Sequence, residues 1–275
     1  MTESPQPLRG PAPPAEEPLL AVTDLEFGPA GKPLAAPLSF SLEAGRCLVL
    51  LGSNGAGKTS LMRTLIGGLP ALGGSIRWQG HALRSLSPRE LAATVAFAAP
   101  RSGDTQDFSV EQLVLLGRIG ARGLFAQPDA EDLSIVDSVI ERMGLSGLRA
   151  RRLGQLSDGE RQLAGVARAL AQQSRVLILD EPAASLDPGR QARLLEIVAQ
   201  LIADGQAVIL STHDPNHALF IADELLLWQA PSTIVWGSAQ ALLEASRLEA
   251  MYGVPVRRHQ TSEGEAVFAV GMRRR

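Results

Sequence analysis

The sequence of 275 residues has one cysteine, Cys47, and no long apolar run. Cys47 stands in the apolar stretch 47–51, which favours a small buried side chain over a redox or metal-binding group and fits a reducing compartment. Runs such as LVLL, VLIL and AVIL are about five residues long, whereas a membrane-spanning helix needs roughly 20. The chain is therefore not expected to cross a membrane.

The sequence also has little excess charge, with a formal net charge of −3 at pH 7. A chain without a global basic field is not expected to bind nucleic acid tightly and non-specifically. With 45% hydrophobic and 20% charged residues, the composition excludes disorder of the whole chain. It is typical of a globular protein with one large domain or a core with a lobe.

Both ends of the sequence are expected to be tails. Residues 1–18 are rich in proline and lack a basic region followed by an apolar stretch, which predicts a disordered tail without a targeting signal. Residues 257–275 carry Arg257, Arg258 and the arginines 273–275, which could touch lipid headgroups. A solvated C-terminal tail is the preferred interpretation, because these charges are few for an anchor.

From Leu20 onward, short β-type runs alternate with helical patterns, which is typical of an α/β protein with a parallel sheet. Continuous apolar runs predict central strands that are covered on both faces, at 48–51, 176–179 and 208–211.

Helical patterns fill much of the stretch between the first two of these strands, at 110–116, 129–143 and 160–172. We expect residues 99–174 to form a helical lobe inserted into a core of residues 19–98 and 175–256. Near the end of this core, the pattern predicts a hairpin at 222–228 and 233–236, and then a helix at 238–250.

A phosphate-binding loop follows the strand at 48–51. Residues 52–59, GSNGAGKT, fit the pattern G-x-x-x-x-G-K-[ST], and a helical segment begins directly after them. Such a loop turns its backbone N–H groups toward phosphates, while Lys58 reaches the β/γ oxygens and the Thr59 hydroxyl ligates Mg²⁺. The predicted contacts to ATP in this segment are Gly52, Ser53, Asn54, Gly55, Ala56, Gly57, Lys58, Thr59 and Ser60.

The loop alone does not distinguish a transport ATPase from a small-molecule kinase or a GTPase. Two adjacent carboxylates, Asp180 and Glu181, end the strand at 176–179. Successive side chains at a strand end point apart, so we expect Asp180 to hold Mg²⁺ through water and Glu181 to orient and deprotonate the attacking water. The alternative, two solvated acids that cap the strand, fits four preceding apolar residues poorly.

The segment LSDGE, residues 156–160, precedes the last predicted helix of the lobe. Ser157 and Glu160 form a capping box, which by itself explains a helix start. The segment also resembles the LSGGQ signature of ABC transporter ATPases, matching it at Leu156, Ser157 and Gly159. In that family two subunits clasp two ATP molecules head to tail, which implies that Ser157 and Gly159 face the γ-phosphate bound by the partner.

The resemblance covers about residues 20–256 and implies the fold of the family. This is an α/β P-loop NTPase core with a mostly parallel sheet, antiparallel β strands near the N-terminus and an inserted helical lobe. His213, in the run STHD after the strand at 208–211, matches the switch histidine, which hydrogen-bonds the γ-phosphate and holds Glu181 and the water in line. A metal pair of His213 with His217 is disfavoured because Pro215 interrupts the helical spacing.

Two other positions carry a role through the resemblance. Asp187, in the run SLD, matches the D-loop that crosses the dimer interface, and it also fits an N-cap before Pro188. Phe27 lies nearest to the place where the family stacks adenine, with Gly28 and Pro29 as other candidates.

Two residues depart from the family pattern. Asp158 replaces a glycine of the signature, and a carboxylate there is repelled by phosphate unless it points away. Arg101 stands where the family has a coupling glutamine that touches Mg²⁺, and a guanidinium cannot ligate a cation. Gln106 fits the role of the coupling glutamine only if the loop that contains it is rearranged. No residue of the sequence is therefore assigned to this role.

Within the family, the sequence is similar to the ATPases of importers for iron chelates, haem and cobalamin, with molybdate importers as close relatives. The matching segments are LGR at 116–118, LFA at 124–126, ERQ at 160–162, THDP at 212–215 and MYGVPV at 251–256. The resemblance implies a homodimer bound to transmembrane permease subunits at the cytoplasmic face of the inner (plasma) membrane. A substrate-binding protein would be an indirect partner, and the helical lobe would receive the permease's coupling helix.

Two other function classes fit the sequence less well. A soluble ABC ATPase that acts on DNA or ribosomes usually has two nucleotide domains or a long coiled-coil insertion, and the sequence shows neither. A P-loop kinase does not account for the signature segment or for His213. The sequence therefore predicts an ATPase that energises an importer.

Overall fold

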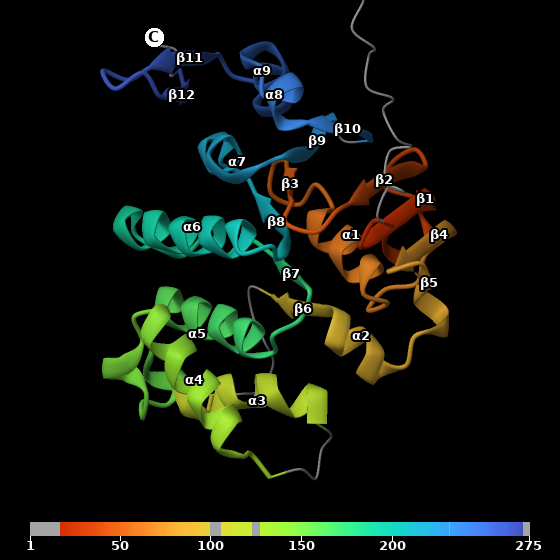
Figure 1. Cartoon of the computed structure of the whole chain (residues 1–275). Coiled ribbons are helices and arrows are strands. Elements are labelled where there is room, and N and C mark those ends of the chain that lie inside the picture. Colours follow the sequence, from red (N-terminus) through yellow and green to blue (C-terminus); the bar gives the residue numbers. More distant parts are fainter. Residues whose placement is uncertain (1–16, 100–105, 123–126, 231, 272–275) are drawn as a thin grey trace, which may run out of the picture.

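The computed structural model describes residues 17–99, 106–122, 127–230 and 232–271, with the backbone alone for residues 120–122. An α/β core forms the larger part of the molecule, and a helical lobe of α3, α4 and α5 lies beneath it in the view of Figure 1. Most of the predicted tail of residues 1–18 lies outside the described residues. In the described ranges, no helix combines the length and apolar composition that a bilayer span requires.

A six-stranded sheet forms the centre of the core, in the order β10-β9-β3-β8-β7-β6. Its five strands from β9 to β6 run parallel, and β10 pairs antiparallel with β9 at the edge. Their bounds are β3 Cys47–Leu51, β6 Val95–Ala98, β7 Val176–Leu179, β8 Ala207–Thr212, β9 Glu224–Ala230 and β10 Thr233–Ser238. The predicted central strands and the hairpin are therefore present.

Alternate residues of this sheet enter two separate cores, which explains why β3, β7 and β8 are apolar at successive positions. One face, with Val49 and Leu177, packs against the lobe and helices α6 and α7. The other face, with Leu50 and Ile178, packs against α1, which lies between the two large sheets (Figure 1). These helices are α1 Lys58–Leu65, α6 Pro188–Ala203 and α7 Pro215–Ile221.

A second, antiparallel sheet covers the outer side of α1, in the order β2-β1-β4-β5. Its elements are β1 Leu20–Glu26, β2 Leu38–Leu42, β4 Gly73–Trp78 and β5 His81–Ala82. A short helix, α2 Pro88–Thr94, then leads into the edge strand β6. The predicted N-terminal antiparallel strands are confirmed, and with them the P-loop α/β fold.

The helical lobe contains α3 Val110–Arg122, α4 Ala130–Arg142 and α5 Asp158–Ala171. Capping boxes at Asp129 and Ser157 start α4 and α5. Arg118 of α3 donates to the buried Asp132 carboxylate at 2.9 Å and to the Ala171 carbonyl at 2.8 Å, so one side chain ties the three helices together. The exact division into lobe and core, 99–174 against the rest, stays a prediction.

The C-terminal part differs from the sequence prediction. The expected helix at 238–250 is two helices, α8 Ala239–Leu242 and α9 Ala245–Tyr252, because Leu243 and Glu244 leave the helical conformation between them. The expected tail after residue 256 contains a two-stranded ribbon, β11 Val256–Gln260 and β12 Ala266–Val270. Polar residues dominate β11, so the pattern hides a ribbon whose anchor is the buried Phe268.

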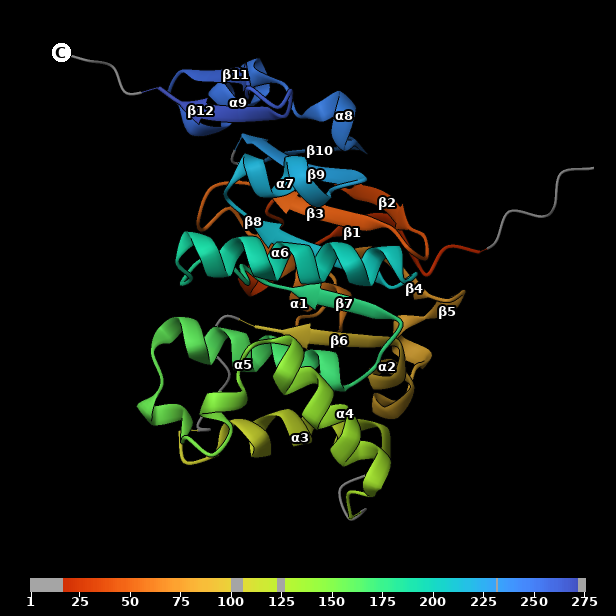
Figure 2. The same ribbon diagram turned by 60° about the vertical axis from the view of Figure 1, so that its left-hand side comes forward.

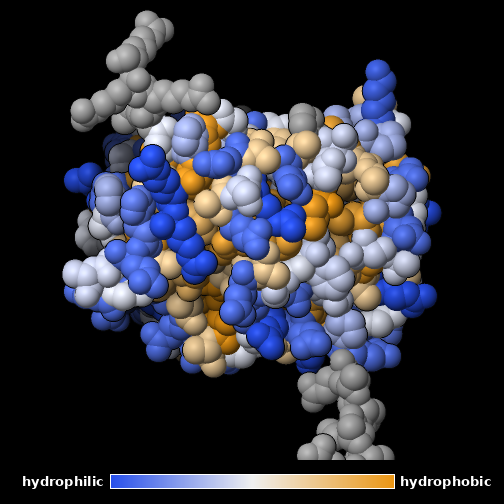
Figure 3. Space-filling model, turned by 90° about the horizontal axis from the view of Figure 1, so that it is seen from above, coloured by the Kyte–Doolittle hydropathy of each residue, from blue (hydrophilic) through white to orange (hydrophobic). Residues whose placement is uncertain are grey.

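The face formed by these C-terminal elements is mainly hydrophilic, with hydrophobic side chains in small areas between charged ones (Figure 3). Three of their apolar side chains, Leu248, Val256 and Phe268, point inward and are buried in the core that includes α7. Figures 1 and 2 both place the ribbon beside α9 and above α7. The ribbon is thus packed onto the core.

The packing of α3 on α5 predicts the effect of one methyl group. A Cβ at Gly117 would lie 2.2 Å from the Arg168 carbonyl oxygen, which is backbone and cannot turn away. We expect Gly117→Ala to destabilise the protein by about 1–3 kcal/mol, through forced separation of the two helices. Urea unfolding followed by circular dichroism measures this change.

Gly165→Ala is the matched control, since a Cβ at Gly165 of α5 meets nothing within 4 Å. This control should be neutral or stabilise the helix by up to about 1 kcal/mol, because alanine has the higher helix propensity. Equal stability of the two variants would contradict the close approach of α3 to α5.

Candidate functional site

The phosphate loop joins β3 to α1 and depends on glycine at two positions. Gly57 has φ +104°, and a Cβ there would lie 2.6 Å from the Leu34 side chain. A Cβ at Gly52 would lie 2.8 Å from the Cβ of Trp228. No side chain caps α1, which begins at Lys58, so its first N–H groups are left for an anion.

Lys58 is the buried cation of this loop, with 4% of its surface exposed. Its Nζ donates to the carbonyls of Gly52 at 2.6 Å and Ser53 at 3.0 Å, and it lies 2.9 Å from Oε1 of Glu181. The ammonium is therefore held between the loop and the carboxylate at the end of β7. Three donors on one nitrogen match these three acceptors.

Asp180 is fully buried and is linked to helix α1 and to the end of the neighbouring strand β8. Its Oδ2 accepts from the Thr59 hydroxyl at 2.7 Å, and its Oδ1 accepts from the Ser211 hydroxyl at 2.7 Å. Because β7 and β8 pair in register, with Leu179 opposite Leu210, the next residues Asp180 and Ser211 face each other. The structure thus brings the two predicted metal-site residues, Thr59 and Asp180, into direct contact.

Glu181 turns away from the strand through a left-handed backbone conformation, φ +48°. Such a conformation is strained for a residue with a Cβ and is common at functional sites. The Ser211 hydroxyl accepts from its N–H at 2.8 Å, and the amide of Gln162 donates to its carbonyl at 3.4 Å. These two contacts hold the turn that separates the Glu181 side chain from that of Asp180.

The Glu181 carboxylate lies between two nitrogen atoms, Nζ of Lys58 and Nδ1 of His213, the latter 2.8 Å from Oε2. Burial alone would raise the pKa of Glu181, but the hydrogen bonds from Lys58 and His213 outweigh it and lower the pKa below its usual value. The carboxylate is therefore ionised at neutral pH. An ionised carboxylate has the charge state that a general base requires.

His213 follows β8 and exposes 48% of its side chain. Nearby, His217 of α7 is turned inward, with Nδ1 3.2 Å from the Thr212 hydroxyl. Burial lowers the pKa of His217, so this ring stays neutral at pH 7. Glu181, Lys58 and His213 thus form one cluster, whereas His217 contacts the Thr212 hydroxyl, just before His213 in the chain.

The signature segment starts α5 in the way that the sequence predicts. The Ser157 hydroxyl accepts from the Glu160 N–H at 3.3 Å, and the Glu160 carboxylate accepts from the Ser157 N–H at 2.9 Å. Asp158, the unusual residue, forms an ion pair with Arg161 of the same helix. This pairing offsets the negative charge that departs from the family pattern.

Gly159 makes a close approach to the D-loop of its own chain. A Cβ there would lie 2.8 Å from the carbonyl oxygen of Ser185 and 3.2 Å from the Leu186 side chain. Asp187 then caps α6, accepting from the Arg190 N–H at 3.0 Å. The predicted N-cap role of Asp187 is therefore present, and the signature helix packs directly against the segment that leads to it.

The adenine-stacking role predicted for Phe27 does not fit the structure. Phe27 is 1% exposed and belongs to the core between α1 and the antiparallel sheet. Its ring lies beneath the phosphate loop, 3.9 Å from a Cβ built at Gly57. A ring buried beneath the loop cannot stack on a base, and we correct its role to support of the loop.

Three residues of the site were missed from the sequence. Ser211 links Asp180 to Glu181, Gln162 reaches Glu181 from the lobe, and Tyr252 donates to the His213 carbonyl. The sequence could have indicated Ser211, because it ends a strand expected to lie beside the strand that leads to Asp180. Gln162 and Tyr252 reach the site only through tertiary packing, which the sequence does not show. Arg101 lies outside the described residues, and the Gln106 carbonyl accepts from the Gly154 N–H within the lobe.

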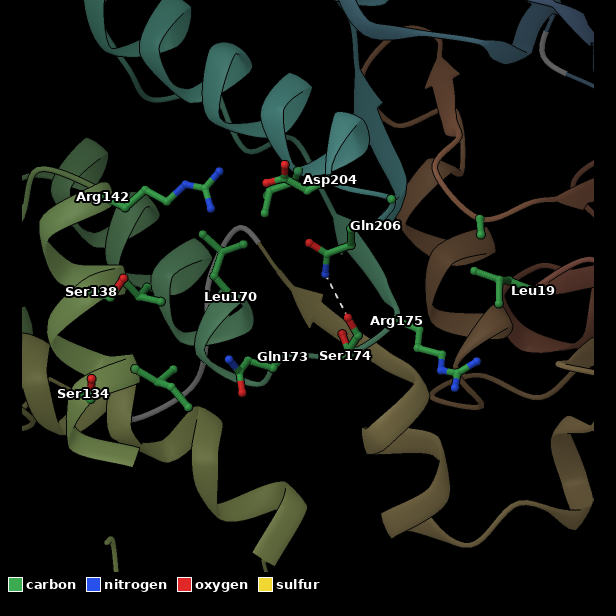
Figure 4. A pocket seen from close by; sticks show the side chains of 15 residues that line it. Leu19, Ser134, Ser138, Arg142, Leu170, Gln173, Ser174, Arg175, Asp204 and Gln206 are labelled. Atoms are coloured by element: carbon green, nitrogen blue, oxygen red, sulfur yellow. Dashed lines mark hydrogen bonds between the residues drawn. The ribbon is translucent and has the colours of Figure 1, made fainter. Parts of the chain in front are cut away.

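A pocket of about 770 Å³ lies elsewhere (Figure 4). Its lining comes from α4, from the turn before β7 at Ser174 and Arg175, and from the turn before β8 at Asp204 and Gln206. These are the amino ends of the parallel strands, whereas the phosphate loop and Glu181 follow the carboxyl ends. Ligands of such sheets bind at the carboxyl ends, so this cavity is not the nucleotide site.

Comparison with known proteins agrees with this geometry. Residues 35–184 match the ABC transporter family. The chain is 36% identical over 246 residues to the hemin import ATP-binding protein HmuV of Deinococcus radiodurans. The aligned region covers 87% of this chain and 92% of the relative. An ABC transporter ATP-binding protein of Haemophilus influenzae is 38% identical over 234 residues, 85% of this chain and 89% of the relative.

A solved structure described as a metal-chelate type ABC transporter in an inward-facing conformation matches with a TM-score of 0.80 and 27% identity. The match covers 94% of this chain and 99% of the other. The ADP form of the ATP-binding cassette MJ1267 matches with a TM-score of 0.73 at 22% identity, over 86% of this chain and 98% of that one, which shows the shared fold. The chain therefore belongs to the ABC transporter family, as an ATP-binding subunit that couples ATP hydrolysis to transport.

Proposed function

We propose that this chain drives the import of an iron chelate or hemin. The observation that carries the proposal is the match along nearly the whole chain to hemin import and iron chelatin transport ATP-binding proteins, together with the metal-chelate type structure. The complete catalytic cluster of Lys58, Glu181 and His213 supports an active motor in this role. Cobalamin and molybdate import are the alternatives that a transport assay separates.

The residues of the cluster have separate tasks in the proposed reaction. Lys58 exchanges its contact with Glu181 for the β- and γ-phosphate oxygens of ATP, because its ammonium already lies at the start of α1. The released Glu181 carboxylate orients the attacking water and takes its proton, and His213 holds this carboxylate in place from the other side. Residues 52–57 and Ser60 supply the remaining loop contacts to the phosphates.

The site also fits Mg²⁺. Thr59 offers a hydroxyl and Asp180 a carboxylate, 2.7 Å apart, and Mg²⁺ in such sites takes few protein ligands and completes its shell with water and phosphate oxygens. The cation would neutralise charge on the phosphates. Thr59 would bind it directly and Asp180 through water.

We further propose that two copies form the working unit. Ser157 and Gly159 lie at the N-terminus of α5, in the lobe, and in a head-to-tail dimer they would complete the phosphate site of the partner. The Ser157 hydroxyl now accepts from the Glu160 N–H, and it keeps a proton to donate to a phosphate oxygen. The pairing of Asp158 with Arg161 reduces repulsion at this interface.

We also propose partners beyond the dimer, which the membership in a transporter family with membrane subunits supports. The dimer would work beneath two permease subunits at the cytoplasmic face of the inner membrane, and a substrate-binding protein would deliver the chelate from the other side. The division of residues 19–256 into core and lobe supports this assembly, because the lobe is the part that would contact the permease. ATP binding closes the dimer, and hydrolysis reopens it.

The proposed base predicts a trapped intermediate. Glu181→Gln keeps the size and shape of the side chain but removes the negative charge and the proton acceptor, so ATP hydrolysis should fall by about 10²–10⁴-fold while ATP binding persists. Size-exclusion chromatography with ATP and Mg²⁺ should show a stable dimer. Hydrolysis at the normal rate would show that Glu181 is not the base.

The proposed phosphate contact predicts a binding defect. Lys58→Ala removes a charge-assisted bond worth about 1.5–3 kcal/mol, so the Kd for ATP should rise at least about tenfold in a fluorescent-nucleotide titration. Arg63→Ala, an exposed position on the same helix, is the control and should bind ATP normally. Unchanged affinity in Lys58→Ala would contradict the phosphate loop assignment.

The proposed substrate class predicts a selective response. The ATPase is purified with its permease, placed in liposomes with the binding protein, and supplied with hemin, an iron siderophore, cobalamin or molybdate. Hemin or the siderophore should stimulate ATP hydrolysis and be imported, whereas a response to cobalamin or molybdate alone would overturn the iron-chelate assignment. Glu181→Gln serves as the inactive control.

A further inference from the structure

The loop that carries His213 is fastened from outside by the C-terminal part of the chain. Tyr252, the last residue of α9, donates its hydroxyl to the backbone carbonyl of His213. Tyr252 is also the only tyrosine of the sequence. A residue 39 positions further along the chain thus bonds the backbone of the histidine that holds Glu181.

A second contact fastens the same loop three residues further on. The side-chain amide of Asn216, in the first turn of α7, accepts from the Phe268 N–H at 2.8 Å and donates to the Phe268 carbonyl at 3.1 Å. One amide therefore satisfies both backbone groups of a residue in β12. Phe268 is itself 5% exposed, so this attachment is anchored in the core.

The fastening segment, residues 245–271, is held together internally, and we call it the C-terminal clasp. The Glu249 carboxylate of α9 accepts from the Val256 N–H at 2.9 Å, and the ribbon closes back where Gly271 N–H donates to the Pro255 carbonyl at 2.7 Å. Figures 1 and 2 show α9, β11 and β12 grouped above α7. The position of Tyr252 is therefore fixed by the attachment at Asn216.

The His213 ring has few constraints of its own. Its side chain is 48% exposed, and Nδ1 of the ring contacts Oε2 of Glu181. A half-exposed ring on a loop keeps its orientation only if the backbone of the residue is held in place. Burial, together with the nearby Asp214 carboxylate, raises the pKa of Tyr252 above its usual value, so the hydroxyl remains a donor at neutral pH.

We propose that Tyr252 is a positioning residue for ATP hydrolysis, which acts through the backbone of His213 to keep the imidazole against the Glu181 carboxylate. This inference rests on the roles proposed above for Glu181 and His213. It assigns the C-terminal clasp a part in the chemical step. Among the described residues, the clasp forms no hydrogen bond or ion pair with the phosphate loop.

The test is Tyr252→Phe, which removes the hydroxyl and keeps the ring. We expect kcat for ATP hydrolysis to fall about 10- to 100-fold, since loss of alignment in a reacting group has effects of this size, while KM for ATP changes less than about twofold. Trp236→Phe is the matched control, because it also removes one hydrogen bond from an aromatic side chain, the bond to Glu224 at 2.9 Å, in the hairpin away from the switch. The control should keep the normal kcat.

A double-mutant cycle separates positioning from general loss of structure. In a His213→Ala background, Tyr252→Phe should have no further effect on kcat, because there is no ring left to position. Asn216→Ala provides a second way to loosen the clasp and should lower kcat in the same direction. The thermal unfolding midpoints of the variants show whether each remains folded.

The outcomes distinguish the two levels of the proposal. If His213→Ala hydrolyses ATP normally, the role of His213 is wrong and the positioning role falls with it. If His213→Ala is impaired but Tyr252→Phe has normal kcat, only the positioning role is overturned. Equal effects of Tyr252→Phe in both backgrounds would also overturn it, since Tyr252 would then act independently of His213.

Discussion

The geometry of the site depends on one carboxylate, Glu181, that two nitrogen groups hold from opposite sides. Burial of an ionised group is unfavourable unless the charge is paired and hydrogen-bonded, and here Lys58 and His213 both contact it. These residues follow three different strands, β3, β7 and β8, which are adjacent in the parallel sheet. The pairing therefore requires the sheet order, the strand register and the left-handed turn at Glu181 all at once. In the proposed reaction, Lys58 moves to the phosphates of ATP, and the His213 contact is then what holds the Glu181 carboxylate.

The lobe reaches this cluster through α5. Gln162 donates to the Glu181 carbonyl, and Gly159 allows the N-terminus of the helix to pack on Ser185, two residues before the cap of α6 at Asp187. Since α3 and α4 are tied to α5 through Arg118, the lobe is a lever attached at the catalytic end. If a permease displaces the lobe, as proposed, the displacement would act on the backbone of Glu181, the proposed base. This gives the coupling between transport and hydrolysis a physical route within one chain.

Much of this arrangement could be predicted from the sequence, for reasons that differ between residues. Lys58, Asp180 and Ser157 lie in local patterns whose chemistry is fixed by short spacing, and the buried strands are continuous apolar runs. The stacking role of Phe27 does not fit because the resemblance gives only the place of an aromatic residue in the sequence and does not show on which side of the phosphate loop its ring lies. Tyr252 and Asn216 could not be found, since their partners His213 and Phe268 are 39 and 52 residues away. The polar pattern of β11 likewise concealed the ribbon that makes the second of these contacts.

The switch loop is thus held at its base by the clasp and at its tip by Glu181. If binding of the γ-phosphate moves His213, the loop must either carry the clasp with it or give up the Tyr252 hydrogen bond, at a net cost of about 0.5–1.5 kcal/mol. The two bonds from Asn216 to Phe268 raise that cost further. A ligand shifts a conformational equilibrium only by its difference in affinity for the two states, here with His213 on Glu181 and with His213 moved to the γ-phosphate. The clasp therefore sets how much more favourable the contacts of the second state must be before His213 leaves Glu181. In this way the C-terminal ribbon, which is remote from the nucleotide, favours the catalytic alignment of His213 and Glu181.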